Sequence, residues 1–274
     1  MTKKIIAITG SKGVLGSYFV KKFKNYTYDF FKGDINDYKK VQNWIENTKA
    51  NYLLHLAAKV STDSVKKNYQ AAVETNFLAT KNMINCISKS KKSIWFFFAS
   101  TSHVYQSKNK RIKESSLTKP ITLYGKTKLK AEKYLIKFCK KENIKLCIGR
   151  IFSFTHKNQA SNFLIPSLYK KVTSRNTIIN VKNLNHQRDF SHIDDICRAI
   201  NLLRKKKCNG IYNIGSGISI NLMDIIKILN NKKKIIFSKN KHKTSIVADI
   251  SKINKIGYHP YFDINKTLSD FRKK

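Results

Sequence analysis

Three glycines near the N-terminus, at positions 10, 13 and 16, constrain the fold more than any other feature of the sequence. They directly follow the apolar, β-branched run "KIIAIT" and open the segment "GSKGVLGSYFVKKFK", which continues as a helical pattern. Such a run predicts a buried strand. Glycine permits a tight turn and a close approach of the backbone to a ligand, and the N-terminus of the next helix favours an anion. The sequence therefore predicts a strand, a turn and a helix suited to a phosphate group.

Apolar strands alternate with helices over residues 1–152. Strands without polar alternation, separated by helices, are typical of a parallel sheet that is covered on both faces. The pattern predicts an α/β fold with a doubly wound parallel sheet, the Rossmann arrangement. The predicted strands lie at residues 4–9, 26–31, 51–58, 93–100 and 145–152.

The alternation stops after about Phe152, where helical segments near 162–174 and 222–229 accompany short strands such as "TIINV" and "KIIFS". We expect a smaller C-terminal substrate-binding lobe made of residues 153–187 and 206–274. Residues 1–152 would form the dinucleotide-binding domain, with residues 188–205 returning to it. A chain of 274 residues is long enough for this organisation.

The net charge of +39, from 55 Lys plus Arg against 16 Asp plus Glu, raises a second hypothesis, which is nucleic-acid binding. Such a charge attracts polyanions with an affinity that falls steeply as salt rises. The lysines, however, are spread along nearly the whole chain, and they far outnumber the arginines that commonly read base edges. This distribution disfavours specific nucleic-acid recognition.

The sequence also contains features that bear on its compartment. No apolar run approaches the roughly 18 residues that a membrane helix needs, and "IIAI" after "MTKK" is too short for a secretory core. The five cysteines are odd in number and form no CxxC, which is typical of a reduced protein without a zinc site. We expect a cytoplasmic protein that has no membrane association and no metal.

Tyr124 and Lys128 stand four residues apart at the start of a predicted amphipathic helix, in "ITLYGKTKLKAE". Residues i and i+4 share one face of a helix, so the phenol and the ammonium are neighbours. A nearby cation stabilises the phenolate and lowers the pKa of a tyrosine, which makes Tyr124 a candidate proton acceptor or donor. A lysine-rich chain also produces such pairs by chance, so the pair by itself leaves both interpretations open.

The GxxGxxG spacing and the Tyr124-x-x-x-Lys128 pair together resemble the extended short-chain dehydrogenase/reductase superfamily. More specifically, the chain resembles the NAD-dependent epimerase/dehydratase family, whose members modify nucleotide sugars. The resemblance covers nearly the whole chain and makes a chance pairing untenable. It includes seven stretches in the order of the family: "GDIND" (33–37), "LLHLAA" (53–58), "TNFLATKNM" (75–83), "FFASTSHVY" (97–105), "YGKTK" (124–128), "RDFSHIDD" (188–195) and "GIYNIGSG" (210–217).

The resemblance implies a catalytic set of Thr101, Tyr124 and Lys128. Tyr124 would move a proton on a sugar hydroxyl or ketone, and Lys128 would hold the nicotinamide ribose and lower the pKa of the tyrosine. Thr101 occupies the Ser/Thr position of the family, where a hydroxyl donates to or accepts from the reacting oxygen.

The resemblance also implies NAD as the cofactor. Asp29 stands about 20 residues past the first glycine, where an acid binds the adenosine ribose, but only one short strand separates the first helix from "GDIND", which leaves its reach open. Lys12 and Lys32 are able to receive a 2′-phosphate, so NADP remains possible. The implied cofactor-binding residues are Gly10, Gly13, Val14, Leu15, Gly16, Asp34, Ile35, Leu56, Ala57, Ala58, Asn76, Tyr124 and Lys128.

For the substrate, the resemblance implies a nucleotide-diphosphate sugar bound by Thr101, Ser153 and Arg188. Arg188 matches the arginine that binds the diphosphate, a role that suits the paired hydrogen bonds of a guanidinium. Ser153 departs from the asparagine that relatives commonly carry. Relatives often dimerise through the tyrosine-bearing helix, so a homodimer is expected by analogy.

The residues after Thr101 narrow the expected reaction. Related 4,6-dehydratases carry Asp-Glu there, and related decarboxylases keep the Glu, whereas this chain has Ser102 and His103. Two activities remain: a 4-epimerase, which removes hydride from C4 of the sugar and returns it to the opposite face, and an NADPH-dependent reductase of 4-keto sugars. The motif set as a whole favours the epimerase. His103 is either a weaker acid/base or a structural residue.

Overall fold

The computed structural model describes residues 4–107, 110–175, 178–182, 186–229, 234–238 and 244–271. The chain divides into two compact units. The first unit comprises Met1–Gln106, Leu117–Arg150 and Cys197–Tyr212, and the second comprises Ser107–Ser116, Ile151–Ile196 and Asn213–Lys274.

A six-stranded parallel sheet in the order β10-β5-β4-β3-β1-β2 forms the centre of the first unit. Strand β1 lies between β2 and β3, with Ile6 opposite Tyr28 on one side and Tyr52 on the other. The doubly wound parallel sheet predicted from the sequence is confirmed. Its strands are β1 (Ile5–Thr9), β2 (Thr27–Phe30), β3 (Tyr52–His55), β4 (Trp95–Thr101), β5 (Leu146–Ile151) and β10 (Gly210–Ile214).

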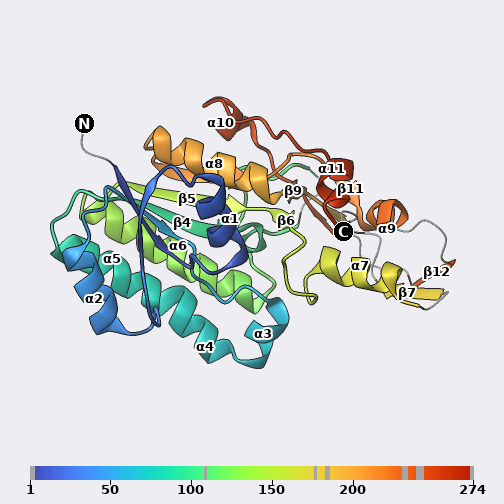
Figure 1. Cartoon of the computed structure of the whole chain (residues 1–274), viewed down its shortest axis with the longest axis horizontal. Helices are drawn as coiled ribbons and strands as arrows, with labels where there is room; N and C mark the ends of the chain where they lie inside the picture. Colours follow the sequence, from blue (N-terminus) through green and yellow to red (C-terminus); the bar gives the residue numbers. More distant parts are fainter. Residues whose placement is uncertain are drawn as a thin grey trace. The chain divides into compact units, whose positions relative to one another are not determined.

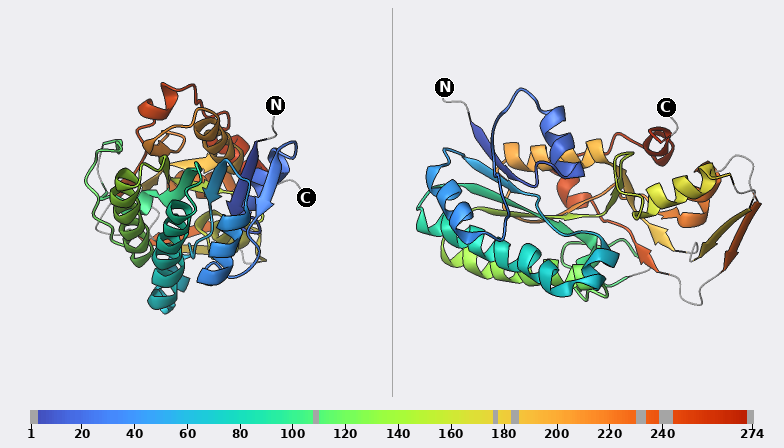
Figure 2. Two further views of the ribbon diagram at one scale, coloured as in Figure 1. Left: turned by 90° about the vertical axis from the view of Figure 1, so that its left-hand side faces the viewer. Right: turned by 60° about the horizontal axis from the view of Figure 1, so that its bottom comes forward.

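Helices cover both faces of this sheet (Figures 1 and 2). Helices α2, α5 and α6 pack side by side on one face, and α1 and α8 lie on the other. Apolar side chains of α2, α5, α6 and the strands form one core cluster that includes Ile45, Met83 and Leu135. The helices are α1 (Val14–Lys22), α2 (Tyr38–Asn47), α3 (Thr62–Lys67), α4 (Tyr69–Val73), α5 (Ala79–Lys89), α6 (Leu123–Lys141) and α8 (Ile193–Lys205).

Helices α2, α3, α4 and α6 of the first unit begin where the sequence supplies capping side chains. The Asp37 carboxylate accepts a hydrogen bond from the backbone N–H of Lys40, and the Thr122 hydroxyl accepts one from Gly125. The Thr122 cap fixes the start of α6 at Leu123, so that Tyr124 lies in the first turn.

A π-helical turn, η1 (Glu74–Leu78), separates α4 from α5. The residue pattern around 71–88 indicates one helix, and nothing in it marks the turn, because a π-turn changes the hydrogen-bond register without changing the residue types. Such turns are frequent at functional sites, and this one contains Asn76.

The second unit contains three small sheets, in the orders β11-β8-β13, β12-β7 and β6-β9. Its helices α7, α9 and α11 bury apolar side chains, such as Leu168, Ile225 and Leu268, in one cluster. The remaining elements are β6 (Ser153–Thr155), α7 (Leu164–Thr173), β7 (Ile178–Lys182), β8 (Gln187–Arg188), β9 (Phe190–His192), β11 (Ile220–Asn221), α9 (Leu222–Leu229), β12 (Lys234–Ser238), β13 (Ser245–Ile246), α10 (Ser251–Asn254) and α11 (Ile264–Ser269).

The boundaries of the two units differ from the domains expected from the sequence. The segment that returns to the first unit is 197–212 rather than 188–205, because β10 completes the sheet beside β5 while β8 and β9 pair within the second unit. Residues 107–116 join the second unit, where Ile112 forms a bridge with Ala248. The assignment of functions to the two parts stays a prediction.

Among the described residues, no helix combines the length and the apolar character needed to cross a bilayer.

Candidate active site

The three N-terminal glycines form a turn that leaves no room for side chains. Gly10 has a φ of +72°, and a Cβ there would lie 2.6 Å from the backbone nitrogen of Ala57. A Cβ on Gly16 would lie 2.2 Å from the carbonyl oxygen of Gly10. The end of β1, the start of α1 and the loop after β3 therefore meet backbone to backbone. The structure brings together Gly10, Gly13, Gly16, Leu56 and Ala57, and their role in cofactor binding stays a prediction.

The N-terminus of α1 has backbone donors that no side chain caps. Gly13 is its N-cap residue and has no side chain, while its own N–H donates to Gly10 O at 3.0 Å. Val14 and Leu15 begin the helix, and its first turn contains no acidic residue. A helix start with unused N–H groups beside a side-chain-free turn fits the pyrophosphate of a dinucleotide.

The loop after β3 is held by a buried chain of hydrogen bonds. The backbone N–H of Ala57 donates to Thr9 Oγ1 at 3.3 Å, and Thr9 Oγ1 lies 2.7 Å from His55 Nδ1. His55 Nε2 in turn lies 2.9 Å from Thr80 Oγ1 on α5. Burial, helped by the charge of Lys128, lowers the pKa of His55 to about 3, so its ring is neutral near pH 7.

Asn76 is completely buried at the π-turn. Its amide oxygen accepts from the N–H of Lys59 at 2.8 Å, and its amide nitrogen donates to Lys59 O at 2.9 Å and to Thr127 Oγ1 at 3.0 Å. Asn76 therefore joins the segment that follows Ala58 to α6. With no exposed surface, its side chain supports the backbone of this loop.

The acidic residues near the end of β2 have different environments. Asp34 is exposed and accepts from the N–H and the side-chain amide of Asn36 at 2.9 and 3.0 Å, while Ile35 beside it is buried. The carboxylate of Asp29 accepts from Trp44 Nε1 at 2.9 Å and from the Thr48 hydroxyl. Asp29 thus joins β2 to the end of α2, and a contact with the adenosine ribose stays a prediction.

Thr101 and Tyr124 meet through a close contact between α6 and the 3₁₀ turn η2 (Ser102–Val104). A Cβ on Gly125 would lie 2.3 Å from the backbone oxygen of His103, so the glycine of "YGKTK" permits this approach. The Thr101 hydroxyl is close enough to the Tyr124 phenol to lower its pKa. Thr101, Tyr124 and Lys128 are all buried, with 6%, 9% and 1% of their surface exposed.

The pKa values at this site differ from the expectation based on the sequence. Burial raises the pKa of Tyr124 to about 12, and the hydrogen bond with Thr101 lowers it only in part. Burial also lowers the pKa of Lys128 to about 7, against the raising effect of Glu132. The expected lowering of the tyrosine pKa is thus wrong for the protein alone, because burial penalises both charged forms. The ammonium of Lys128 lies 3.9 Å from the centre of the Phe98 ring.

His103 is exposed and stands at the edge of the same group. Its ring is 5.7 Å from that of Tyr124 in an edge-on arrangement, and its Nδ1 is 3.3 Å from Thr122 Oγ1. Its backbone N–H donates to Thr101 Oγ1 at 3.2 Å. These contacts show a structural role in orienting Thr101 and do not decide the acid/base alternative.

In the second unit, Arg188 is held against a neighbouring segment. Its Nη1 donates to the backbone oxygens of Gln187 and Thr244 at 2.7 and 3.1 Å, and its Nη2 donates to Thr244 Oγ1 at 3.0 Å. Burial lowers the pKa of Arg188 from its usual value. Ser153 lies on β6 and is half-buried.

Within the part of the chain that the structure describes, no three His, Cys, Asp or Glu side chains gather as metal ligands. His192 Nε2 instead lies 2.8 Å from a carboxylate oxygen of Asp270, and both oxygens of Asp195 accept backbone N–H groups.

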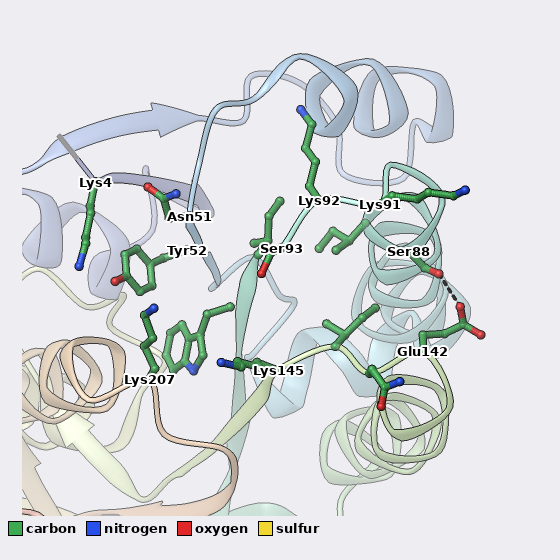
Figure 3. Close-up of a pocket in the computed structure, with 15 residues that line it drawn as sticks. Lys4, Asn51, Tyr52, Ser88, Lys91, Lys92, Ser93, Glu142, Lys145 and Lys207 are labelled. Carbon is green, nitrogen blue, oxygen red and sulfur yellow. Dashed lines mark hydrogen bonds between the residues drawn. The ribbon is translucent and has the colours of Figure 1, made fainter. Parts of the chain in front are cut away.

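A pocket of about 690 Å³ lies in the first unit beside the amino ends of the sheet strands (Figure 3). Lys4, Lys145 and Lys207 line it together with Tyr52. None of the predicted site residues does so. The pocket is therefore separate from the glycine turn, which lies at the carboxyl end of β1.

Several residues of the site were missed in the sequence. His55 occurs in the quoted stretch "LLHLAA", and Glu132 stands four residues after Lys128, so the helical spacing was a visible signal for it. Ser100 and Tyr105 occur in the quoted stretch "FFASTSHVY". Arg150 carries no comparable signal, because only the packing of β5 against α6 and the end of β4 brings it to Glu132 and Tyr105.

Comparisons with known proteins agree with this arrangement. The profile of the "NAD dependent epimerase/dehydratase family" matches residues 6–215. A dTDP-D-glucose 4,6-dehydratase of Dictyostelium discoideum is 28% identical over 273 residues, which include 82% of this chain and 61% of that protein. A UDP-glucose 4-epimerase of Mycoplasma genitalium is 28% identical over 236 residues, which include 77% of this chain and 69% of that protein. This chain thus spans less than two thirds of the dehydratase.

Among solved structures, RMD from Pseudomonas aeruginosa complexed with NADPH superimposes with a TM-score of 0.89. The match includes 98% of each chain at 18% identity. At that identity the similarity shows the fold alone, and it agrees with the doubly wound sheet described above.

Proposed function

Because the chain belongs to the NAD-dependent epimerase/dehydratase family, we propose that it interconverts the C4 epimers of a nucleotide-diphosphate sugar. When bound, NAD supplies the acceptor and then the donor of the C4 hydride. The observation that carries the proposal is the joint burial of Thr101, Tyr124 and Lys128, with the last two on one face of α6, in the unit that contains the glycine turn.

The residues of the chain have separate roles in this proposal. Gly10, Gly13 and Gly16, with the first N–H groups of α1, hold the pyrophosphate of the dinucleotide. Lys128 holds the ribose beside the reacting ring, and Arg188 holds the sugar nucleotide through its diphosphate.

Proton transfer is the role of Tyr124. As the phenolate, Tyr124 would accept the proton of the C4 hydroxyl when C4 is oxidised, and the resulting phenol would return that proton when the 4-keto sugar is reduced from the opposite face. The Thr101 hydroxyl binds the same sugar oxygen and keeps it aligned with the phenol. The burial of this group excludes bulk water from the reaction.

The raised pKa of Tyr124 favours a second candidate function. A phenol with a pKa of about 12 is protonated at neutral pH, which suits a proton donor to a ketone. The second candidate is an NADPH-dependent reductase of 4-keto nucleotide sugars. The exposed Lys12 and Lys32 are available for the additional phosphate of NADP.

Tyr124→Phe tests the shared mechanism. The variant should still bind the dinucleotide but lose turnover by about 10²- to 10⁴-fold, the range of general acid–base catalysis. Tyr134→Phe is the matched control, because it removes another hydroxyl from α6, one that donates to Asn85 at 2.8 Å. Turnover in Tyr124→Phe equal to that of the control would refute the role of Tyr124.

The two candidate activities differ in cofactor use. Native mass spectrometry that finds bound NAD in the purified protein supports the epimerase, and NADPH consumption with a 4-keto sugar supports the reductase. The same spectrum reports the subunit count and so tests the expected homodimer.

A further inference from the structure

A buried carboxylate stands in line with the catalytic side chains of α6. Glu132 is one helical turn beyond Lys128 and two turns beyond Tyr124, so the three residues share one face of the helix. Glu132 has no exposed surface, and the proposed reaction assigns it no role. A buried charge of this kind needs a compensating partner.

Arg150 and Ser100 compensate the carboxylate. Arg150 donates from Nε to both oxygens of Glu132 at 3.1 Å and from Nη2 to Oε2 at 2.7 Å. The Ser100 hydroxyl also donates to Glu132. Ser100 directly precedes Thr101 on β4, so Glu132 joins the catalytic helix to the strand that carries the catalytic hydroxyl.

The surroundings of Lys128 contain few charges. The ring of Phe98 on β4 lies beneath its ammonium, and His55 on β3 is neutral because its pKa is about 3. Tyr124 on α6 is protonated at neutral pH because its pKa is about 12. Arg150 on β5 is a cation that is paired with Glu132. Glu132 is the group whose charge raises the pKa of Lys128, against the larger lowering effect of burial.

We propose that Glu132 is a positioning residue for catalysis: its buried negative charge keeps Lys128 in the ammonium form, and its contact with Ser100 fixes Thr101 relative to Tyr124. This inference rests on the proposed function, in which Lys128 and Tyr124 serve the reaction. An ammonium stabilises the phenolate that forms when Tyr124 gives up its proton, whereas a neutral amine does not. Glu132 thus sets the upper pH at which the site works.

Carbon-13 labelling of the lysine side chains tests the charge directly, without any turnover. Lys128 should titrate near neutral pH, apart from surface lysines that titrate near about 10.4, and Lys128→Met should remove its signal. Glu132→Gln should move this titration to lower pH by about one unit. The alkaline limb of kcat should move by the same amount.

Two further variants separate charge from packing. Glu132→Asp keeps the charge on a shorter side chain and should leave the Lys128 titration close to that of the natural protein. Glu132→Gln alone leaves Arg150 as an unpaired cation. The double variant Glu132→Gln with Arg150→Met removes that cation, so it replaces Glu132→Gln if the single variant does not fold. It should still move the titration to lower pH.

The outcomes distinguish the inference from the proposed function. An unchanged Lys128 titration in a folded Glu132→Gln or double variant overturns the inference, because a purely structural role moves stability but not the titration. An equal shift in Glu132→Asp also overturns it. A shifted titration in a protein that turns over no nucleotide sugar leaves the charge effect in place and refutes the proposed function instead.

Discussion

Glu132 in the first unit and Asp189 in the second are both buried with no exposed surface, but they are compensated in different ways. Glu132 pairs with a cation, Arg150, at 2.7 Å. Asp189 accepts the backbone N–H groups of Ser216, Gly217 and Ala248 at 2.8, 2.9 and 3.2 Å, and the Ser216 hydroxyl at 2.6 Å.

The difference shows what each carboxylate does. An ion pair keeps a full charge inside the first unit, close to Lys128, where electrostatics can act on the reaction. Asp189 joins three chain segments of the second unit, because it follows Arg188 and accepts hydrogen bonds from residues 216–217 and from Ala248. The first arrangement affects chemistry, and the second affects the folding of a loop-rich unit.

The largest expected effect comes from breaking the ion pair. Arg150→Met should lower the free energy of unfolding by about 3–5 kcal/mol, because it leaves the Glu132 charge buried without its partner. Urea denaturation followed by circular dichroism measures the change. Combining it with Glu132→Gln should recover most of the loss. If Arg150→Met alone costs no more than a surface substitution such as Lys137→Met, the pair does not stabilise the fold.

Asp189→Asn should cost about 3 kcal/mol, since a buried donor without a partner costs about 1–3 kcal/mol. The side-chain NH₂ group of the substituted residue would face backbone N–H groups that need an acceptor. Denaturation of this variant beside Asp224→Asn, which changes an exposed carboxylate of the same unit, measures the difference. Equal midpoints for the two variants would contradict the compensation described here.

Gly215→Ala tests the environment of Asp189 with a smaller expected effect. It should lower the free energy of unfolding by about 1–2 kcal/mol, because the added methyl group overpacks the site. Its Cβ would lie 2.7 Å from an oxygen of Asp189, so the Asp189 side chain has to move away from its donors. Gly210→Ala is a poor control, because Gly210 has a positive φ.

Gly125→Ala is the corresponding glycine test in the first unit. The added Cβ would clash with the backbone oxygen of His103. The fractional loss of turnover should exceed the fractional loss of the unfolding free energy. Similar losses of stability and turnover in Gly125→Ala would count against this contact as the reason for the glycine.

The smallest expected effect is a pH dependence of stability. Burial raises the pKa of Asp189, and its hydrogen-bond donors oppose that change only in part. The folded protein then binds this proton more tightly than the unfolded chain, so the contribution to stability is complete below the unfolded pKa, about 3.9, and is lost as pH rises through the folded pKa.

The stability difference between the natural protein and Asp189→Asn should therefore shrink as pH rises above about 4. Urea titrations at a series of pH values measure it. A difference that grows with pH means that the four donors outweigh burial and lower the pKa of Asp189.

Much of the fold was predictable from local patterns. Each predicted strand of the first unit is present, because continuous β-branched and aromatic runs such as "SIWFFFAS" have few alternatives to a buried strand. Two features were not predictable from local patterns. They are the π-turn at Asn76, and the assignment of residues 107–116 to the second unit and of 197–212 to the first. Both depend on contacts between segments far apart in the chain.

The sequence by itself determined the alternation of strands and helices, the glycine turn, and the helical spacing that places Tyr124, Lys128 and Glu132 on one face. These features depend on residue type and on neighbours within a few positions. Only the tertiary structure decided the burial of that face, the pairing of Glu132 with Arg150 and Ser100, and hence the direction of the pKa changes. A pKa depends on the solvent and charges around a group, and those are set by the packing of distant segments.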